Sequence, residues 1–268
     1  MQGDFFSILN IDVNDRAPHI VRMLRAEIGG VVIEGVVSPH VSEQWSERLD
    51  RGELPARPTP FAAEFEAHSI GPCLDQCEGR FDEYLERAAR FDAALAASSP
   101  IDVFAPLHAA LARIAGDYRP TRPRGPGDRL YGFVTLRRLP PGGRIPPHCE
   151  NEQIPRVSYD DLRPRIDAAT LISFYLTLRP ADEGGELAVY DLGYDAIGDR
   201  VRHRHSAMED EVARVRRVLV KPPAGSLIVF DGGRRFHEVL PVGGARARWT
   251  LGGFLAASID HQQLYVWA

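Results

Sequence analysis

The chain has 268 residues, 44% hydrophobic and 26% charged, which excludes a largely disordered protein and predicts a soluble globular fold with a real core. Its formal net charge of −5 gives no chain-wide basic surplus, so we expect no nucleic-acid partner. No apolar run approaches the roughly 18 residues that span a bilayer. The first residues also lack the pattern of a secretory signal, so we expect no membrane association and a cytoplasmic location.

The basic residues are almost all arginine, which is typical of a GC-rich and therefore bacterial genome. The three cysteines are Cys73, Cys77 and Cys149, and an odd, low number favours a reducing compartment over a disulfide scaffold. Cys73 and Cys77, four residues apart, could supply two ligands of a zinc site, but no second Cys/His pair with suitable spacing follows them. We therefore expect three reduced thiols and no structural zinc.

The first half of the chain is predicted to be mostly helical. Ser38 followed by Pro39 is a typical helix start, because serine caps the helix and proline suits its first turn. In chain order we expect a strand over 29–37, a helix over 38–49, a loop over 51–79, and helices over 80–97 and 103–114.

The second half of the chain has short apolar runs separated by Pro-Pro, Gly-Gly and Asp-Gly turns, a pattern typical of β-sandwiches and barrels. Strands are expected over 130–136, 170–178, 186–190, 215–221, 226–230, 237–242 and 248–256. Helices followed by strands predict an α+β fold, with N-terminal helices packed on a jelly roll, or double-stranded β-helix.

We expect a single domain over 1–268, with mostly helical support in 1–128 and the jelly-roll catalytic core in 129–258. Residues 193–214 carry many charges and few large apolar side chains. We interpret them as an insertion, part helix and part loop, whose role as a lid stays open.

The most informative segment is Pro146-Pro147-His148-Cys149-Glu150-Asn151. Two prolines favour an extended chain, so His148 and Glu150 point to the same face. With His237, which follows a later strand, they supply two imidazoles and a carboxylate. This is the facial triad of non-haem Fe(II) oxygenases, which leaves three positions on the metal open. The His-x-Glu pair alone is also compatible with a surface histidine and a solvated glutamate.

The residues around these three extend the pattern. Gly184-Gly185-Glu186-Leu187, the run 223–230, and the segment from His237 to Val242 that leads on to Arg248-Trp249-Thr250-Leu251 follow in order. Together with His148-x-Glu150 they resemble the Fe(II)/2-oxoglutarate-dependent dioxygenases, specifically their prolyl-hydroxylase-like branch, over residues 130–257.

The resemblance implies that His148, Glu150 and His237 are the catalytic iron ligands. It implies that Arg248, with Tyr175, binds the distal carboxylate of 2-oxoglutarate, and that dioxygen is the oxidant. The family has aspartate more often than glutamate at the position of Glu150. Halogenating relatives lack this carboxylate and use the vacated position for chloride, so the resemblance favours hydroxylation here.

Several other residues stay open as candidates. Arg246 competes with Arg248 for the co-substrate carboxylate, because the two lie two residues apart on one strand. His203-Arg204-His205 is either a metal pair or a solvated loop. Asn151 either orients substrate or caps a turn. Arg138 and Arg144 either meet an acidic substrate or lie on the surface, and we expect Cys149 to be a packed thiol.

We expect the substrate to be a small molecule, such as an amino acid, an amino-acid derivative or a secondary metabolite. A prolyl or other residue of a peptide or protein remains an alternative. So does a non-redox jelly-roll protein, either a cupin-like binding protein or an isomerase. A homo-oligomer is left open.

Overall fold

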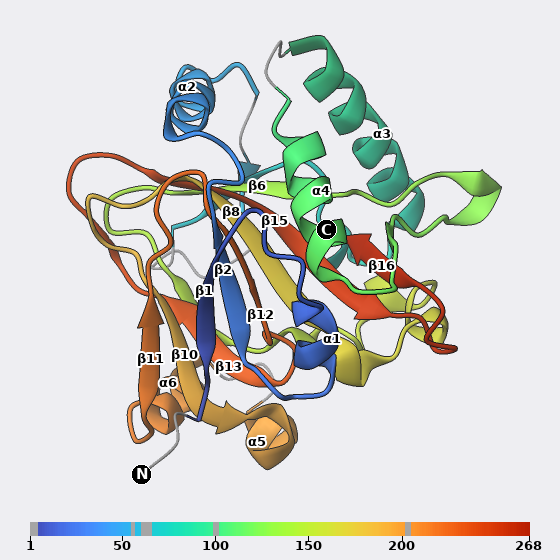
Figure 1. Cartoon of the computed structure of the whole chain (residues 1–268), viewed down its shortest axis with the longest axis vertical. Coiled ribbons are helices and arrows are strands. Elements are labelled where there is room, and N and C mark those ends of the chain that lie inside the picture. Colours follow the sequence, from blue (N-terminus) through green and yellow to red (C-terminus); the bar gives the residue numbers. More distant parts are fainter. Residues whose placement is uncertain (1–4, 55–56, 60–65, 99–101, 202–204) are drawn as a thin grey trace.

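Two facing β-sheets form the centre of the protein (Figure 1). The computed structural model describes residues 5–54, 57–59, 66–98, 102–201 and 205–268. Within these residues the larger sheet has ten strands and the smaller sheet has four. The expected α+β fold with a jelly-roll core is confirmed. No helix in the described part of the chain is long and apolar enough to cross a membrane.

The larger sheet carries strands from both halves of the chain. Its neighbours run β1 (Ile8–Asp12), β2 (Gly30–Glu34), β12 (Leu227–Phe230), β8 (Ile172–Arg179), β15 (Arg248–Ala257), β6 (Thr135–Leu139), β4 (His68–Ile70) and β3 (Arg57–Pro58). β16 (Leu264–Trp267) also pairs with β15, and β5 (Pro120–Thr121) pairs with β16. Two of these pairings are parallel, β1 with β2 and β16 with β5.

The smaller sheet is antiparallel and supplies the other wall of the jelly roll. Its order is β11 (Arg217–Val220), β10 (Leu187–Gly193), β13 (Arg235–Val239) and β7 (Ile145–His148). The two sheets meet through apolar side chains, since Val32, Ile228 and Phe230 of the larger sheet pack against Leu187 and Val189 of the smaller one. A separate short pair joins β9 (Glu183–Gly184) to β14 (Val242–Gly243).

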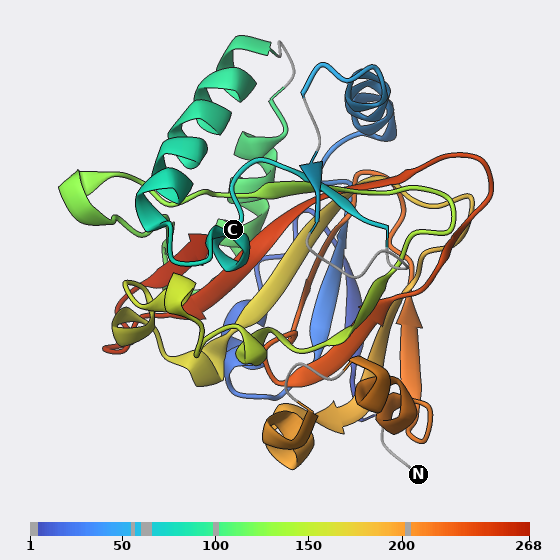
Figure 2. The same cartoon turned by 180° about the vertical axis from the view of Figure 1, so that it is seen from behind.

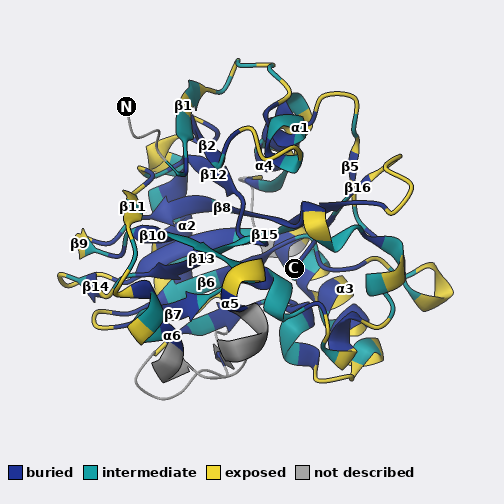
Figure 3. Ribbon diagram, turned by 90° about the horizontal axis from the view of Figure 1, so that it is seen from below, coloured by how far each residue is buried: buried dark blue, intermediate teal, exposed yellow. Residues whose placement is uncertain are grey.

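Helices cover the outer face of the larger sheet. They are α1 (His19–Leu24), α2 (Pro39–Asp50), α3 (Phe81–Ser98) and α4 (Phe104–Ile114). Side chains from every one of them join a single apolar cluster with Leu136, Leu176 and Leu251 of the sheet. Figure 3 shows the strands as a largely buried centre with exposed residues at the loops and helix surfaces. The predicted cap of α2 is present, because Ser38 Oγ accepts a hydrogen bond from the Val41 N–H at 3.3 Å.

The described residues of the expected insertion 193–214 form α5 (Tyr194–Val201) and α6 (His205–Val212). Both lie at the end of the molecule opposite α2, α3 and α4 (Figure 1). Buried Ile197 and Met208 pack against Tyr190 and Phe236, on the face of the smaller sheet that points away from the larger one. These helices therefore support the smaller sheet from outside.

The structure corrects the sequence-based elements at several places. The expected strand over 130–136 begins only at Thr135 and runs to Leu139, because Gly132 instead bonds to the Tyr84 hydroxyl and to the amide of Ala268. The expected loop over 51–79 contains β3 and β4. β1 and β16 were not expected at all, and both join the larger sheet; Figure 2 shows this sheet from behind.

Candidate active site

Two neighbouring strands of the smaller sheet bring the predicted ligands together. β7 ends at His148, and its cross-strand partner on β13 is His237. Glu150 follows β7 and turns back toward the same point. One ligand atom from each residue lies within 4.8 Å of the other two. Glu150 Oε1 is 3.1 Å from His237 Nε2 and 3.9 Å from His148 Nε2.

Both histidines are oriented by their own strands. The Nδ1–H of His148 donates to the carbonyl of Pro146 at 2.8 Å, and that of His237 donates to the carbonyl of Arg235 at 2.9 Å. Nε2 of each ring faces Glu150, and because Nδ1 donates to a carbonyl, Nε2 is the nitrogen that can bind a metal once it is free of a proton. Such a hydrogen bond behind each ring is typical of metal-binding histidines.

The electrostatics of the three groups favour a bound cation. Burial and the nearby charge of His237 lower the pKa of His148 to about 4, which leaves a neutral ligand at physiological pH. Burial acts to raise the pKa of Glu150, but the charge of His237 and its hydrogen bond outweigh it, so the pKa falls. Glu150 is therefore a carboxylate, and although burial opposes it, the charge of Glu150 and its hydrogen bond raise the pKa of His237, whose Nε2 donates to Glu150 in the absence of a metal. The buried Oε2 of Glu150 has no hydrogen-bond partner among the described residues.

A pair of glycines makes room for the glutamate. The backbone N–H of Glu150 donates to the Gly232 carbonyl at 3.1 Å, and Cys149 Sγ donates to the Gly233 carbonyl at 2.7 Å. A Cβ added to Gly232 would lie 2.6 Å from Glu150 Oε2 and 2.2 Å from Ser173 Oγ. A side chain at 232 would therefore force Glu150 or Ser173 to move, whereas glycine leaves space for the longer arm of Glu150. Sequence reasoning missed this role, although Asp231-Gly232-Gly233 is visible as a turn.

The second part of the site is a buried arginine. Arg248 opens β15, is 4% exposed, and places its guanidinium carbon 5.1 Å from the centre of the Tyr175 ring. No carboxylate pairs with it among the described residues. Burial lowers the pKa of Arg248 and raises that of Tyr175. A buried cation beside a buried hydroxyl without a partner is costly unless an anion completes the arrangement.

Arg246 lies in a different environment. It is on the surface, where its guanidinium donates to Asp182 at 2.8 Å and to Glu43 at 3.4 Å. The two arginines that competed in the sequence are therefore distinct in the structure, because only Arg248 points between the sheets.

These observations test whether the residues fit an iron ion and 2-oxoglutarate. The donor set is two imidazole nitrogens and a carboxylate oxygen, which suits Fe(II). The buried guanidinium of Arg248 and the hydroxyl of Tyr175 suit the far carboxylate of a dicarboxylic acid. The residues present fit both groups.

The other residues that the sequence offered as candidates lie outside the triad. Arg144 pairs with Glu209 at 2.8 Å. Arg138 faces the helices, because its cross-strand partner is Trp249 of the helix-covered core.

Asn151 has a buried Oδ1 without a partner among the described residues. Cys73, Cys77 and Cys149 are free and buried. Within the described chain the triad is the one group of side chains placed to hold a metal, and the His203-Arg204-His205 motif lies outside the residues whose side chains are described.

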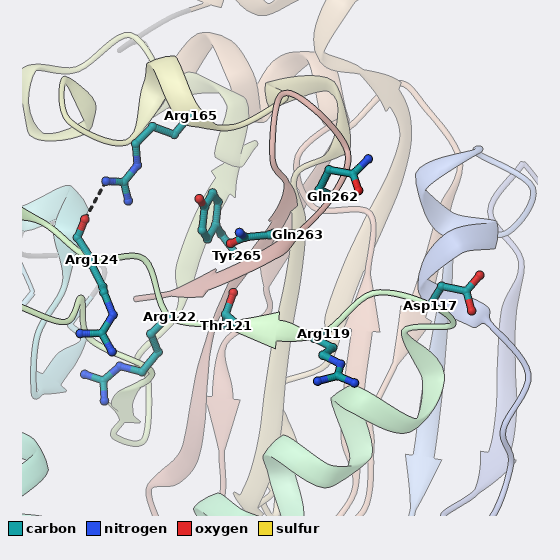
Figure 4. Close-up of a pocket in the computed structure, with 9 residues that line it drawn as sticks. All are labelled: Asp117, Arg119, Thr121, Arg122, Arg124, Arg165, Gln262, Gln263 and Tyr265. Carbon is teal, nitrogen blue, oxygen red and sulfur yellow. Dashed lines mark hydrogen bonds between the residues drawn. The ribbon is translucent and has the colours of Figure 1, made fainter. Parts of the chain in front are cut away.

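A surface hollow of about 740 Å³ lies elsewhere on the molecule (Figure 4). Its lining includes four arginines, but three of them already have acidic partners. Arg122 pairs with Asp92, Arg124 with Asp128 and Arg165 with Asp161. No ligand of the triad lines this hollow, so it is separate from the candidate active site.

The fold and the family agree with this site. No curated protein matches the chain. Among solved structures, it is similar to an N-substituted L-amino acid dioxygenase from Burkholderia ambifaria AMMD, with a TM-score of 0.59 and 16% identity over 92% of this chain and 90% of that one. It is also similar to the 2-oxoglutarate-dependent carbocyclase SnoK of nogalamycin biosynthesis, with a TM-score of 0.53 and 13% identity over 91% and 87% of the two chains.

The family comparison covers almost the whole chain. Residues 4–268 match the model of the carrier-protein-independent halogenase WelO5. The expected membership among Fe(II)- and 2-oxoglutarate-dependent enzymes is thereby confirmed. The chain belongs to the WelO5 halogenase family and is an Fe(II)- and 2-oxoglutarate-dependent oxygenase.

Proposed function

We propose that this enzyme hydroxylates a small-molecule substrate and does not halogenate it, although its family takes its name from a halogenase. One observation carries the proposal. The carboxylate of Glu150 lies 3.1 Å from His237 Nε2, in the position of a third iron ligand. The resemblance to the dioxygenases implies that halogenating relatives leave this position open for chloride. A carboxylate there removes the halide position.

The protein's residues have separable roles in this reaction. His148 and His237 would bind iron through Nε2, and Glu150 through one carboxylate oxygen. Arg248 and Tyr175 would bind the distal carboxylate of 2-oxoglutarate. Iron and 2-oxoglutarate, when bound, supply the oxidising chemistry with dioxygen.

The pocket walls also contribute. Phe230 stacks edge-on against His237, with ring centres 5.0 Å apart, and it is 3% exposed. Together with Ile228 it excludes water from the side of the site that lies deepest between the sheets. A dry wall strengthens the electrostatic hold of Arg248 on its ligand, because water no longer screens the pair.

The amino-acid class of substrates is supported by fold similarity to the N-substituted L-amino acid dioxygenase, which is a likeness of fold at 16% identity. We therefore place free and N-substituted amino acids first among substrates to test. Hydroxylation of a residue within a peptide is the alternative outcome of the same screen.

The experiment combines Fe(II)-loaded enzyme, 2-oxoglutarate, dioxygen and chloride with these compounds, and measures succinate together with product mass. The proposal expects products that gain one oxygen atom. Products in which chlorine replaces hydrogen would refute it. The Glu150→Gly variant is the matched comparison. It should lose hydroxylation, because the two remaining histidines hold iron more weakly, and it should not gain efficient chlorination.

A further inference from the structure

Two buried oxygen atoms near the metal position have no hydrogen-bond partner among the described residues. They are Oε2 of Glu150 and Oγ of Ser173, in residues that are 4% and 5% exposed. One belongs to a hydroxyl, which can donate, and the other to a carboxylate, which can only accept. Each atom therefore offers what the other lacks.

Strand pairing brings Ser173 to this place. Its neighbours on β8, Ile172 and Phe174, belong to the helix-covered cluster, so the side chain of Ser173 points toward the smaller sheet. Its cross-strand partner on β12 is Phe230, the last residue of that strand before the turn that contains Gly232. The serine therefore lies beside the turn against which the third predicted ligand rests.

The open side of Gly232 is where the two oxygens approach one another. A Cβ added to this glycine would lie 2.2 Å from Ser173 Oγ and 2.6 Å from Glu150 Oε2. Both distances start from one point, so both oxygens border the same small volume. Rotation about the side-chain bonds of Ser173 or Glu150 brings such a donor and acceptor into hydrogen-bonding range.

Other donors around this turn already have acceptors. The backbone N–H of Glu150 donates to the Gly232 carbonyl at 3.1 Å. The thiol of Cys149 donates to the Gly233 carbonyl at 2.7 Å. The hydroxyl of Ser173, in contrast, is a side-chain donor at this turn that still has no acceptor among the described residues.

The two carboxylate oxygens of Glu150 face different neighbours. Oε1 is 3.1 Å from His237 Nε2 and 3.9 Å from His148 Nε2, so it is the oxygen on the metal side. Oε2 lies on the side of Gly232 and Ser173. Glutamate has one more rotatable bond than aspartate, so its carboxylate loses more conformational freedom when it is kept in one orientation.

We propose that Ser173 is a positioning residue, whose hydroxyl donates to Glu150 Oε2 when a metal is bound and so presents Oε1 to the metal. This inference rests on the proposed function, because it requires Glu150 to be the third ligand. Carboxylates that bind metals are typically hydrogen-bonded by residues behind them. At this site the hydrogen bond supplies the restriction that a shorter aspartate has by itself.

The test measures metal binding and not turnover. The Fe(II) dissociation constant is measured anaerobically, without 2-oxoglutarate, by competition with a chromogenic chelator. Ser173→Ala should weaken Fe(II) binding by about 10–100-fold, as the loss of groups behind metal ligands does. In a Glu150→Gly background the same substitution should change the dissociation constant by less than about threefold, because no carboxylate remains to be positioned.

Further variants separate hydrogen bonding from packing. Ser173→Thr keeps the hydroxyl and should retain most of the affinity, whereas Ser173→Cys has a similar shape but a weak donor and should resemble Ser173→Ala. Ser42→Ala is the matched control, since it removes a buried hydroxyl without a described partner from α2, on the other face of the sheet. It should leave the iron affinity unchanged. Denaturant unfolding of the metal-free proteins shows which variants are folded, and Ser173→Cys replaces Ser173→Ala if the alanine variant does not fold.

Several results would overturn the inference. They are an undiminished iron affinity in Ser173→Ala, an equal loss with and without the Glu150 carboxylate, and equal affinities in the threonine, cysteine and alanine variants. If Glu150→Gly alone binds Fe(II) as tightly as the parent, Glu150 is no ligand and the proposed function fails as well. Chlorinated products together with a Ser173 effect that depends on Glu150 would contradict only the proposed function.

Discussion

The two faces of the larger sheet differ sharply, although the same strands build both. On the face toward the helices, Leu136, Leu176 and Leu251 join one apolar cluster. On the face toward the smaller sheet, β2 and β12 carry apolar residues, whereas β8 and β15 also carry polar or charged ones, among them Tyr175, Thr177 and Arg248. Neighbouring residues on one strand therefore serve opposite purposes.

Several hydrogen-bonding groups at or near this inner face lack partners among the described residues. Buried side-chain atoms without a partner include those of Ser173, Tyr175 and Thr177 on β8 and of Glu150 and Asn151 after β7. A buried polar atom without a partner costs about 1–3 kcal/mol of stability. The helix-covered face stabilises the fold through apolar packing, whereas the inner face keeps polar groups that a ligand can bind.

The strongest test of this division concerns an inner-face ligand. His237→Ala should abolish turnover and Fe(II) binding, because two ligands remain where three are needed. The metal-free variant should unfold at nearly the same denaturant concentration as the metal-free parent. Anaerobic iron titration and denaturant unfolding measure the two effects. Iron binding equal to that of the parent would exclude His237 as a ligand.

Next in size is the loss of the co-substrate arginine. Arg248→Ala should weaken 2-oxoglutarate binding by about 2–5 kcal/mol, because a buried carboxylate loses a charge-assisted partner. Arg246→Ala is the matched control, since it removes an exposed guanidinium from the same region and should have little effect. Titration of both variants with 2-oxoglutarate ranks them, and the reverse ranking would move the carboxylate site to Arg246.

The helix-covered face should respond in the opposite way. Leu251→Ala, at a fully buried position of β15, should lower the free energy of unfolding by about 2–5 kcal/mol. The variant that remains folded should still bind iron and 2-oxoglutarate with the affinities of the parent. Chemical denaturation gives the first quantity and anaerobic titration the second. A large loss of iron affinity would show that the two faces are not separable.

A smaller loss of iron affinity is expected from a substitution at Gly232, which lies against the Glu150 carboxylate. Gly232→Ala places a methyl group against Glu150 Oε2 and Ser173 Oγ, so the carboxylate must move. Iron affinity should fall about 10–100-fold, as it does when groups that position metal ligands are changed. The double variant Gly232→Ala/Glu150→Asp should recover part of the loss, because the shorter arm needs less room. No recovery would mean that the glycine serves the backbone alone.

The smallest effect is expected from a hydroxyl on the polar face. Thr177→Val replaces a 2% exposed side chain whose Oγ1 has no partner among the described residues. The free energy of unfolding should stay constant or rise by up to about 1 kcal/mol, because no hydrogen bond is lost. Denaturant unfolding of the metal-free protein measures it. A marked loss of stability would reveal a partner for this hydroxyl.

Much of the site could be predicted from short-range patterns. His148 and Glu150 lie two residues apart on an extended segment, and this local spacing carried the ligand prediction. The role of Gly232 could not be found in this way. It depends on how close Gly232 comes to Glu150, which is set by contacts between distant parts of the chain.

The strands of the fold could likewise be predicted only where the local sequence decides their structure. The apolar run of β12 predicts a buried strand by itself, whereas β1 takes its place only through parallel pairing with β2. The segment before Thr135 has a strand-like composition, yet it bonds to Tyr84 and to the backbone of Ala268. Composition indicates a tendency, and tertiary partners decide the outcome.

The prolines of β7 weaken the edge of the smaller sheet against local unfolding. β7 is the outermost strand of the smaller sheet, and Pro146 and Pro147 have no N–H to offer to its ladder with β13. A metal held between His148 and His237 would act as a cross-link between these two strands. Iron loading should therefore slow proteolysis and amide exchange at this edge, so that the enzyme's lifetime in the cell depends on its iron supply.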